Sequence, residues 1–474
     1  ERHTGIRLGI KDIFYGVTIE GIAYALEGVE GRYEGIERAE EKEYYMISPS
    51  QKLYFSTAHL WDYNMVDMTN NIPMAFRVKG PFSHEKAEAA FEALMQRHEI
   101  LRTSFHLING ETFMKVHDQV EMEMAYQERL GEEDMDAMAR DFARPFDLRK
   151  APLMRTRVVK IGDEDFVIFM DCHHIISDGV SSDLLLEEFF TLYMGGKLAE
   201  TRLQYRDYSE WTLQRSLAEQ ESYWMNHFKD GVPKLKLPED YPRPKERKFN
   251  GDVLTITLDK NLSDKVVNIC KKMSMTPYMA WMSMAMILFS KYADDKGVVM
   301  GSPVSGRTHR DTEDMQGVFI NRLLFSGKPD GEKMLVEFLN EVKENCLMAY
   351  ENQDYPLTSL MQKFEPQAHL DKSRLPLYDI QFLLYEDDGG SMNEFEMAGL
   401  HVEVVEMKFV DKEAKFDLVC RFAERDGQYT LTLKYCTDLF KEETIKAMTD
   451  HFIQILERLD ENLDQNIESL VCQK

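Results

Sequence analysis

A short apolar run that ends in two histidines constrains the fold of this chain most. Residues Phe166–Met170 follow the polar turn Gly162–Asp165, a pattern typical of a buried β-strand. His173 and His174 come shortly after the run. Neighbouring side chains of an extended chain point to opposite faces, so the two imidazoles cannot reach one small target. The pattern therefore predicts one histidine in a cleft and one held inside.

Two further residues with chemical potential follow the histidine pair. Asp178 comes four residues after His174, and Gly179 permits a tight turn or a close backbone approach. A base, a carboxylate and a glycine at a strand end suit acyl transfer or proton transfer. The competing interpretation is a histidine that only packs in the core or lies on the surface. A shared zinc site is disfavoured because the side chains diverge and no third ligand lies at suitable spacing nearby.

The totals exclude some functions. The chain has 474 residues, of which 43% are hydrophobic, so we expect about three domains or two large lobes. A net charge of −26 argues against binding to nucleic acid or an anionic membrane. The most apolar stretch, Tyr278–Phe289, is too short to span a bilayer. It follows Thr276-Pro277, which are suited to an N-cap and a first helical position, so a buried helix is predicted. We expect a cytoplasmic protein without a signal peptide.

The cysteines show no C-x-x-C spacing and predict reduced, packed thiols in place of a disulfide framework. Cys172 borders the histidines and is a possible nucleophile. A packing role is favoured because no separate activating group is evident. The six cysteines are Cys172, Cys270, Cys346, Cys420, Cys436 and Cys472.

The first 44 residues differ in composition from the rest. Residues 9–15 and Ile19–Leu26 predict two short helices, which cannot bury a core alone. Residues 28–44 are rich in glycine and glutamate, which is typical of a linker. A module boundary is therefore predicted before Tyr45.

The His-His-x-x-x-Asp-Gly segment resembles the signature of condensation domains of nonribosomal peptide synthetases. Related acyltransferases of the chloramphenicol acetyltransferase type carry a His-x-x-x-Asp-Gly core. Other segments resemble motifs of the same family in the same order along the chain. They are Ser48–Tyr54, Arg97–Phe105, Tyr205–Trp211, Gly301–Arg307, Gln316–Leu323, Asn352–Pro356 and Ser373–Asp379.

This resemblance implies an α/β (α+β) fold. Two chloramphenicol acetyltransferase-like lobes form a V-shaped pseudo-dimer with a central tunnel, and alternating strands and helices in both halves agree with it. The implied domains are 45–212 for the N-terminal lobe and 213–474 for the C-terminal lobe. Residues 1–27 are similar to the last two helices of a peptidyl carrier protein, and 28–44 form the linker. The carrier's serine, expected in a Gly-Gly-x-Ser context upstream, is absent, and Gly389-Gly390-Ser391 is interpreted as a turn.

The implied reaction is peptide-bond formation. The amine of an acceptor on a downstream peptidyl carrier domain attacks the aminoacyl or peptidyl thioester on an upstream one. The 4'-phosphopantetheine arms are presented by the carriers, and this chain is expected to bind no cofactor or metal. An adjacent adenylation domain is a further expected partner. An upstream carrier with no epimerization domain between implies a donor that ends in an L residue.

The resemblance also assigns roles to the residues of the signature. We expect His174 to contact the attacking amine, either as a base or as an orienting acceptor, and His173 to be structural. Asp178 is expected in an ion pair with Arg102 as first candidate and Arg307 as second. The alternative is that Asp178 orients His174.

Three further residues are candidates with a structural alternative each. The backbone N–H of Gly179 is a candidate donor to the thioester oxygen, and the alternative is a plain turn glycine. Ser305 and Asn321 are candidate donors lining the tunnel.

Other functions remain open at this level. An epimerization domain also follows a carrier, but Ser182 stands where a Trp is expected there after Val180-Ser181. A heterocyclization domain has paired aspartates in place of the histidines. A non-catalytic, condensation-like platform that recruits partner proteins to a carrier is the alternative from another class.

Overall fold

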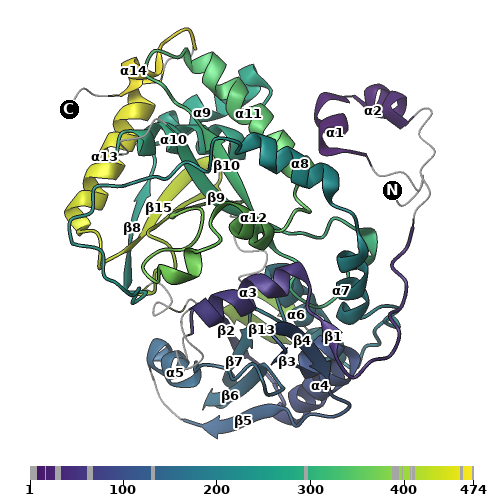
Figure 1. Ribbon diagram of the computed structural model, residues 1–474. Helices are drawn as coiled ribbons and strands as arrows, with labels where there is room; N and C mark the ends of the chain where they lie inside the picture. The colour runs from purple at the N-terminus through teal and green to yellow at the C-terminus, as the bar shows by residue number, and fades with distance from the viewer. Residues whose placement is uncertain are drawn as a thin grey trace.

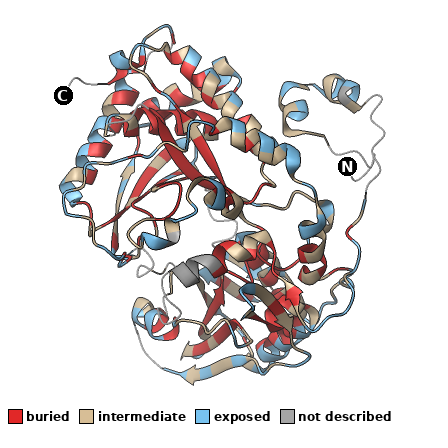
Figure 2. Ribbon diagram, in the orientation of Figure 1, coloured by how far each residue is buried: buried red, intermediate tan, exposed pale blue. Residues whose placement is uncertain are grey.

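The chain forms two lobes, with two short N-terminal helices beside the second (Figure 1). Buried residues concentrate on the sheets and on the helix faces that cover them (Figure 2). Residues Gly389–Ser391 and Cys472 lie outside the described part of the chain. The computed structural model describes residues 8–16, 18–26, 34–60, 68–129, 134–292, 297–386, 394–397, 399–405, 407, 412–459 and 463–471.

The first lobe is built on a six-stranded sheet in the order β12-β13-β2-β7-β6-β5. Strand β7 carries the predicted apolar run, which is continuous because both faces of the strand are covered. Ile168 and Met170 face the helices α4 (His84–Arg97) and α6 (Gly179–Tyr193), while Val167 and Phe169 face α5 (Met135–Phe142). The strands are β12 (Glu394–Met397), β13 (Leu400–Val404), β2 (Asn71–Lys79), β7 (Asp165–His173), β6 (Met154–Gly162) and β5 (Glu123–Glu128).

Helix α4 of this lobe begins at a side-chain cap. Ser83 accepts the backbone N–H of Lys86 at 3.3 Å and caps α4, whose apolar stripe is buried. The helices are α3 (Pro49–Leu60), α4 (His84–Arg97), η1 (Glu99–Arg102), α5 (Met135–Phe142), α6 (Gly179–Tyr193) and α7 (Tyr205–Gln214). A small sheet contains β1 (Tyr45–Met46), β4 (Glu111–Val116) and β3 (Thr103–Ile108).

The second lobe has a sheet in the order β10-β9-β11-β14-β15-β8. Helix α10 is buried along its length, as predicted, and Thr276 caps it. The strands are β8 (Gly251–Thr257), β9 (Val298–Val304), β10 (Asn321–Gly327), β11 (Ile380–Glu386), β14 (Leu418–Arg425) and β15 (Gln428–Cys436). The helices are α8 (Ala218–His227), α9 (Lys260–Met273), α10 (Pro277–Ser290), η2 (Arg310–Thr312), α11 (Leu335–Glu351), α12 (Leu357–Phe364), η3 (Ala368–Leu370), α13 (Glu442–Arg458) and α14 (Ile467–Leu470).

The two lobes repeat one topology. Strands β2-β7-β6-β5 and β8-β15-β14-β11 are paired in the same order, and in both sets the pairs are antiparallel, antiparallel and parallel. A helix follows each first strand (α4 and α9) and each second strand (α6 and α13). The predicted pair of similar lobes is therefore confirmed, although the sequence shows no repeat.

One segment crosses between the lobes. Strands β12 and β13 belong to the second half of the sequence, yet β13 pairs with β2, where His401 is the partner of Lys79. The lobe ranges 45–212 and 213–474 stay a prediction. Strands β12 and β13 depart from it, because they lie in the range of the second lobe but complete the sheet of the first. Such an exchange ties the lobes together through backbone hydrogen bonds.

The two predicted N-terminal helices are present as α1 (Ile10–Gly16) and α2 (Ile19–Leu26). Helix α1 lies against α11, where Lys11 donates its backbone N–H to the Glu351 carboxylate at 2.9 Å. Their origin in a carrier protein stays a prediction. Five cysteines, all those in the described residues, are buried free thiols. No helix in the described ranges is long and apolar enough to cross a bilayer.

Candidate active site

The two histidines diverge at the end of β7. His173 is buried, with 6% of its surface exposed, and its Nδ1 accepts the backbone N–H of Ile175 at 3.1 Å. His174 is the first residue beyond the strand and is partly exposed. Its backbone N–H donates to the carbonyl of Asn70 at 2.7 Å. His173 is thus held inside the lobe, as predicted, and His174 is only partly buried, so its place in a cleft stays a prediction.

The imidazole of His174 is held by two neighbours. Its Nδ1 lies 2.8 Å from the carbonyl oxygen of Ser177. A carbonyl can only accept, so Nδ1 carries the proton and Nε2 keeps its lone pair. The hydroxyl of Tyr54, on α3, lies 3.3 Å from Nε2, and the two rings stack with centroids 4.4 Å apart. His174 therefore presents a hydrogen-bond acceptor in a fixed direction.

Two positive groups of the second lobe act on this imidazole. Burial, followed by the charges of Lys415 and Arg322, lowers the pKa of His174 from 6.5 to about 3. Arg322 lies on β10 and Lys415 precedes β14, so both lobes contribute to the site. Burial, and then His174, also lower the pKa of His173 to about 3. Both rings are thus neutral near pH 7.

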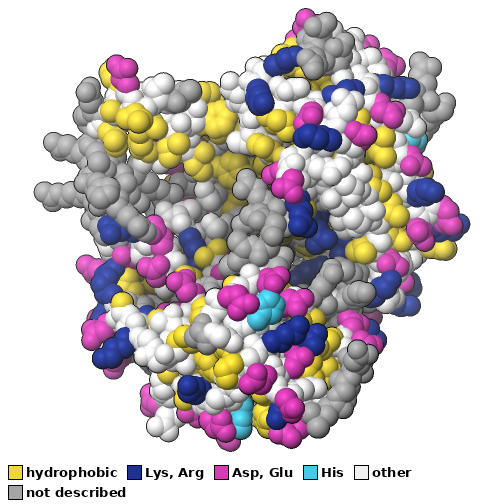
Figure 3. Space-filling view, turned by 180° about the vertical axis from the view of Figure 1, so that it is seen from behind, with side chains coloured by type: hydrophobic (Ala, Val, Ile, Leu, Met, Phe, Trp, Pro, Cys, Tyr) yellow, Lys and Arg dark blue, Asp and Glu magenta, His cyan; other side chains and the backbone are white. Residues whose placement is uncertain are grey.

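Seen from behind, the surface is hollowed between the lobes (Figure 3).

Asp178 joins the lobes and does not orient His174. It caps α6 by accepting the backbone N–H of Ser181 at 2.8 Å, and its other oxygen accepts that of Phe319 at 2.8 Å. Arg307 lies 3.5 Å from this buried carboxylate and is its ion-pair partner. The orienting role was a wrong alternative, because the Nδ1 of His174 is bonded to a backbone carbonyl.

Arg102, the first candidate for that ion pair, was the wrong choice. Its guanidinium donates to the backbone carbonyls of Met95 at 2.8 Å and Gln96 at 3.4 Å, and also to those of His117 and Asp118. The last carbonyls of a helix have no partner within it, and Arg102 satisfies them at the end of α4. The guanidinium of Arg102 is therefore bonded to backbone carbonyls near it in the sequence and does not pair with Asp178.

The remaining candidates have different environments. Asn321 donates to the carbonyls of Gln353 and Tyr355 at 2.8 Å each and accepts the N–H of Leu357, which is a structural role. Ser305 is exposed, and its place along a tunnel stays a prediction. Gly179 is the exposed first residue of α6, and a Cβ there would meet nothing within 4 Å. Its N–H role also stays a prediction.

Three residues of the site carried no predicted role. Tyr54 lies in a segment that resembles a family motif, but its type gave no reason to place it on the histidine. Arg322 is a charged residue inside the apolar run Val318–Phe325, and this contrast is a signal that sequence reasoning could have used. Lys415 stands in a polar stretch without any such signal.

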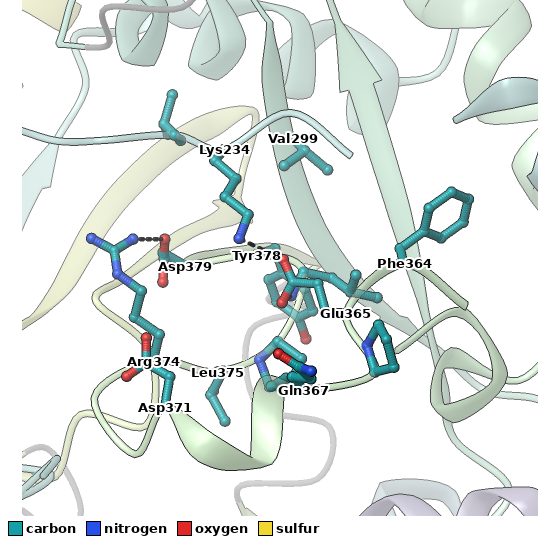
Figure 4. Close-up of a pocket in the computed structure, with 15 residues that line it drawn as sticks. Lys234, Val299, Phe364, Glu365, Gln367, Asp371, Arg374, Leu375, Tyr378 and Asp379 are labelled. Atoms are coloured by element: carbon teal, nitrogen blue, oxygen red, sulfur yellow. Dashed lines mark hydrogen bonds and ion pairs between the residues drawn. The ribbon is translucent and has the colours of Figure 1, made fainter. Parts of the chain in front are cut away.

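A cavity of about 390 Å³ in the second lobe borders this region. Figure 4 shows Lys234 directed at Glu365, 3.0 Å apart, and Arg374 at Asp379, 2.8 Å apart, so its charged walls are largely paired. Tyr378 forms part of the wall, and its phenol group acts to raise the pKa of Arg322. In the described residues no three His, Cys, Asp or Glu side chains gather as a metal site.

Comparison with known proteins places the chain in a family. Residues 41–473 match the model of the condensation domain. Gramicidin S synthase 2 of Brevibacillus brevis is 36% identical over 466 residues, which are 97% of this chain and 10% of that protein. Bacitracin synthase 2 of Bacillus licheniformis is 36% identical over 475 residues, 98% of this chain and 18% of that protein. The chain therefore spans less than a fifth of these relatives.

Solved structures agree on the fold. The X-domain in a complex with OxyB from teicoplanin biosynthesis has a TM-score of 0.81 and 21% identity, and the match covers 94% of this chain and 100% of that one. A four-domain nonribosomal peptide synthetase bound to AMP and glycine has a TM-score of 0.79 and 22% identity over 92% of this chain and 34% of that one.

Fold and site together define a two-lobed α/β domain with a partly buried histidine just beyond the end of a central strand. The chain belongs to the condensation domain family. In nonribosomal peptide synthetases, domains of this family form amide bonds by acyl transfer.

Proposed function

We propose that this chain forms a peptide bond between two carrier-bound substrates. The donor is an aminoacyl or peptidyl thioester on an upstream carrier domain. The acceptor is the α-amine of an aminoacyl group on a downstream carrier. The observation that carries the proposal is the neutral imidazole of His174, whose Nε2 lone pair lies among groups from both lobes.

The reaction needs no oxidant and no bound metal. The amine nitrogen attacks the thioester carbonyl, the C–N bond forms, and the C–S bond breaks. The amine proton ends on the thiol of the released phosphopantetheine arm, so atoms and charge balance. The arms belong to the carriers and enter as part of the substrates.

His174 acts chiefly by placing the amine. A free α-amine has a pKa of about 7.7–8.0, so much of it is neutral near pH 8 without help. An imidazole with a pKa of about 3 is a weak base toward it. Good alignment lowers the activation free energy by up to about 7–11 kcal/mol. General-base catalysis raises the rate by roughly 10²–10⁴-fold, which is a smaller effect. Nε2 of His174 therefore accepts one N–H of the amine and directs its lone pair at the thioester.

The proposal includes the neighbours of this domain. Helices α1 and α2 are the end of the upstream carrier, which delivers a donor with an L residue at its end. A downstream carrier and an adenylation domain supply the acceptor. The similarity to long peptide synthetases, of which this chain spans a small part, supports these partners.

A reconstituted single-turnover reaction tests the function. Two separately loaded carriers, one with a donor and one with an acceptor, are mixed with the chain, and carrier-bound dipeptide is measured by mass spectrometry. We expect product with the wild-type chain and with a surface control, His84→Ala, but a strong loss with His174→Ala. Carrier binding without product from the wild-type chain would contradict catalysis and support a recruiting platform.

A further inference from the structure

Arg322 is a buried cation without a carboxylate partner in the described part of the chain. Only 8% of its surface is exposed. Burial lowers the pKa of its guanidinium, while the neighbouring phenol groups of Tyr378 and Tyr54 raise it. The ring centroids of Tyr54 and Phe416 lie 5.9 and 5.6 Å from its Cζ. A buried charge that lacks an opposite charge is costly, so a site that keeps one is a candidate for an incoming anion.

Carboxylates close by in the fold are committed to other arginines. Asp178 is bound to Arg307 and to two backbone N–H groups. Asp417 lies 2.9 Å from Arg247, in a pair that Arg243 also joins, and Asp379 lies 2.8 Å from Arg374. The arrangement thus pairs these other arginines with carboxylates and leaves Arg322 beside phenol groups.

A second cation strengthens the positive potential at this point. The ammonium of Lys415 lies 5.8 Å from the centroid of the Tyr54 ring, and it donates to the carbonyl of Thr69 at 3.3 Å and to the side chain of Asn70. Tyr54 stacks on His174, so both charges lie next to the place where the thioester and the amine must meet. Burial is the main cause of the lowered pKa of His174, and the charges of Lys415 and Arg322 lower it further.

We propose that Arg322 binds the side-chain carboxylate of a substrate, so that one of the two condensed residues is an aspartyl or glutamyl group. This inference rests on the proposed function. A guanidinium offers a fork of N–H donors that matches a carboxylate. The phosphate of the arm is excluded because it lies at the opposite end from the thioester.

Matched substrates test the inference. Single-turnover rates are measured with Asp against Asn and Glu against Gln, each first as acceptor and then as donor. We expect at least a tenfold preference for a carboxylate in one of the two positions. Arg322→Gln should abolish the preference, while Arg421→Gln, at an exposed arginine of β14, should keep it. Equal rates for each pair in the wild-type chain, or an unchanged preference in Arg322→Gln, would overturn the inference.

Two further measurements distinguish a carboxylate-binding arginine from a structural one. Arg322→Met should melt no lower than the wild-type chain, because it removes an unpaired buried charge, whereas a large drop would mark a structural cation and overturn the inference. Product from the Asn and Gln substrates upholds the proposed function even if no preference appears. If no pair gives product, calorimetric binding of stable amide analogues of aspartyl- and asparaginyl-pantetheine still decides. Tighter binding of the aspartyl form supports the inference, and equal binding contradicts it.

Discussion

The carboxylate of Asp178 accepts the backbone N–H of Phe319 at 2.8 Å, and this bond links the start of α6 to a loop from the second half of the chain. The ring of Phe319 lies in the core of the first lobe, with the guanidinium of Arg307 4.1 Å from its centroid. The aspartate of the signature therefore holds the lobes beside His174 and takes no part in orienting its ring.

Asp178→Ala is expected to destabilise the fold strongly. It leaves the cation of Arg307 buried without its partner, and loss of one member of a buried pair costs about 3–5 kcal/mol. Denaturant unfolding of Asp178→Ala, Arg307→Ala and the double variant measures this. We expect the double variant to lose much less than the sum of the two. A loss below about 1 kcal/mol for Asp178→Ala, or simple additivity, would refute this role.

Gly317 allows a close approach of the backbone to the ring of Tyr205, where the second half of the chain meets the first lobe. Its φ is +150°, and a Cβ would overlap the ring of Tyr205. Gly317→Ala should therefore unfold at a lower denaturant concentration. Its free energy of unfolding should fall by about 1–3 kcal/mol or more. Gly110→Ala is the matched control, because Gly110 also has a positive φ of +84° but an open space at its Cβ. Equal losses in the two variants would show that backbone strain alone is responsible.

Acid should weaken the fold through the buried histidines. His173 has a pKa of about 3 in the folded chain against an ordinary value of 6.5, because burial opposes its charged form. Between these values the unfolded chain binds a proton that the folded chain does not, so stability is full above pH 6.5 and falls as the pH drops. The slope approaches about 1.4 kcal/mol per pH unit for one histidine.

Unfolding free energies of the wild-type chain and of His173→Asn at pH 7.5 and pH 5.0 measure this contribution. The stability lost on acidification should be about 2 kcal/mol smaller in the variant, which has no imidazole to protonate. An identical loss in both proteins would mean that His173 titrates normally in the fold.

The hydroxyl of Tyr54 should be less important than its ring. Tyr54→Phe removes the group 3.3 Å from Nε2 of His174 but keeps the stacked face. One neutral hydrogen bond is worth about 0.5–1.5 kcal/mol, so the single-turnover rate should change by about tenfold at most. Tyr54→Ala, which frees the imidazole to turn, should lose more. If Tyr54→Phe were as impaired as His174→Ala, the hydroxyl would have to take part in the chemistry.

Local features of this structure could be predicted well from sequence. The apolar run at Phe166 predicted β7, and Thr276-Pro277 predicted α10. Each depends on interactions within a few residues, so the pattern contains the information. The burial of one histidine of the pair followed from strand geometry in the same way.

Long-range relationships could not be predicted in this way. Nothing in residues 394–404 indicates that they pair with β2 in the other lobe. The choice between Arg102 and Arg307 depended on which arginine the fold brings to Asp178. Arg102 is nearer in the sequence, but its guanidinium binds the last backbone carbonyls of α4. Tyr54 and Lys415 reach His174 only once both lobes are assembled.

The central claim is that the neutral imidazole of His174 meets the attacking amine. Its most direct test is the ratio of single-turnover rates of wild-type and His174→Ala chains between pH 6 and pH 9. We predict a ratio of at least about 10² that stays constant with pH, because the imidazole remains neutral throughout. A ratio near one, or one that rises through pH 6.5 as an ordinary histidine titrates, would contradict the claim.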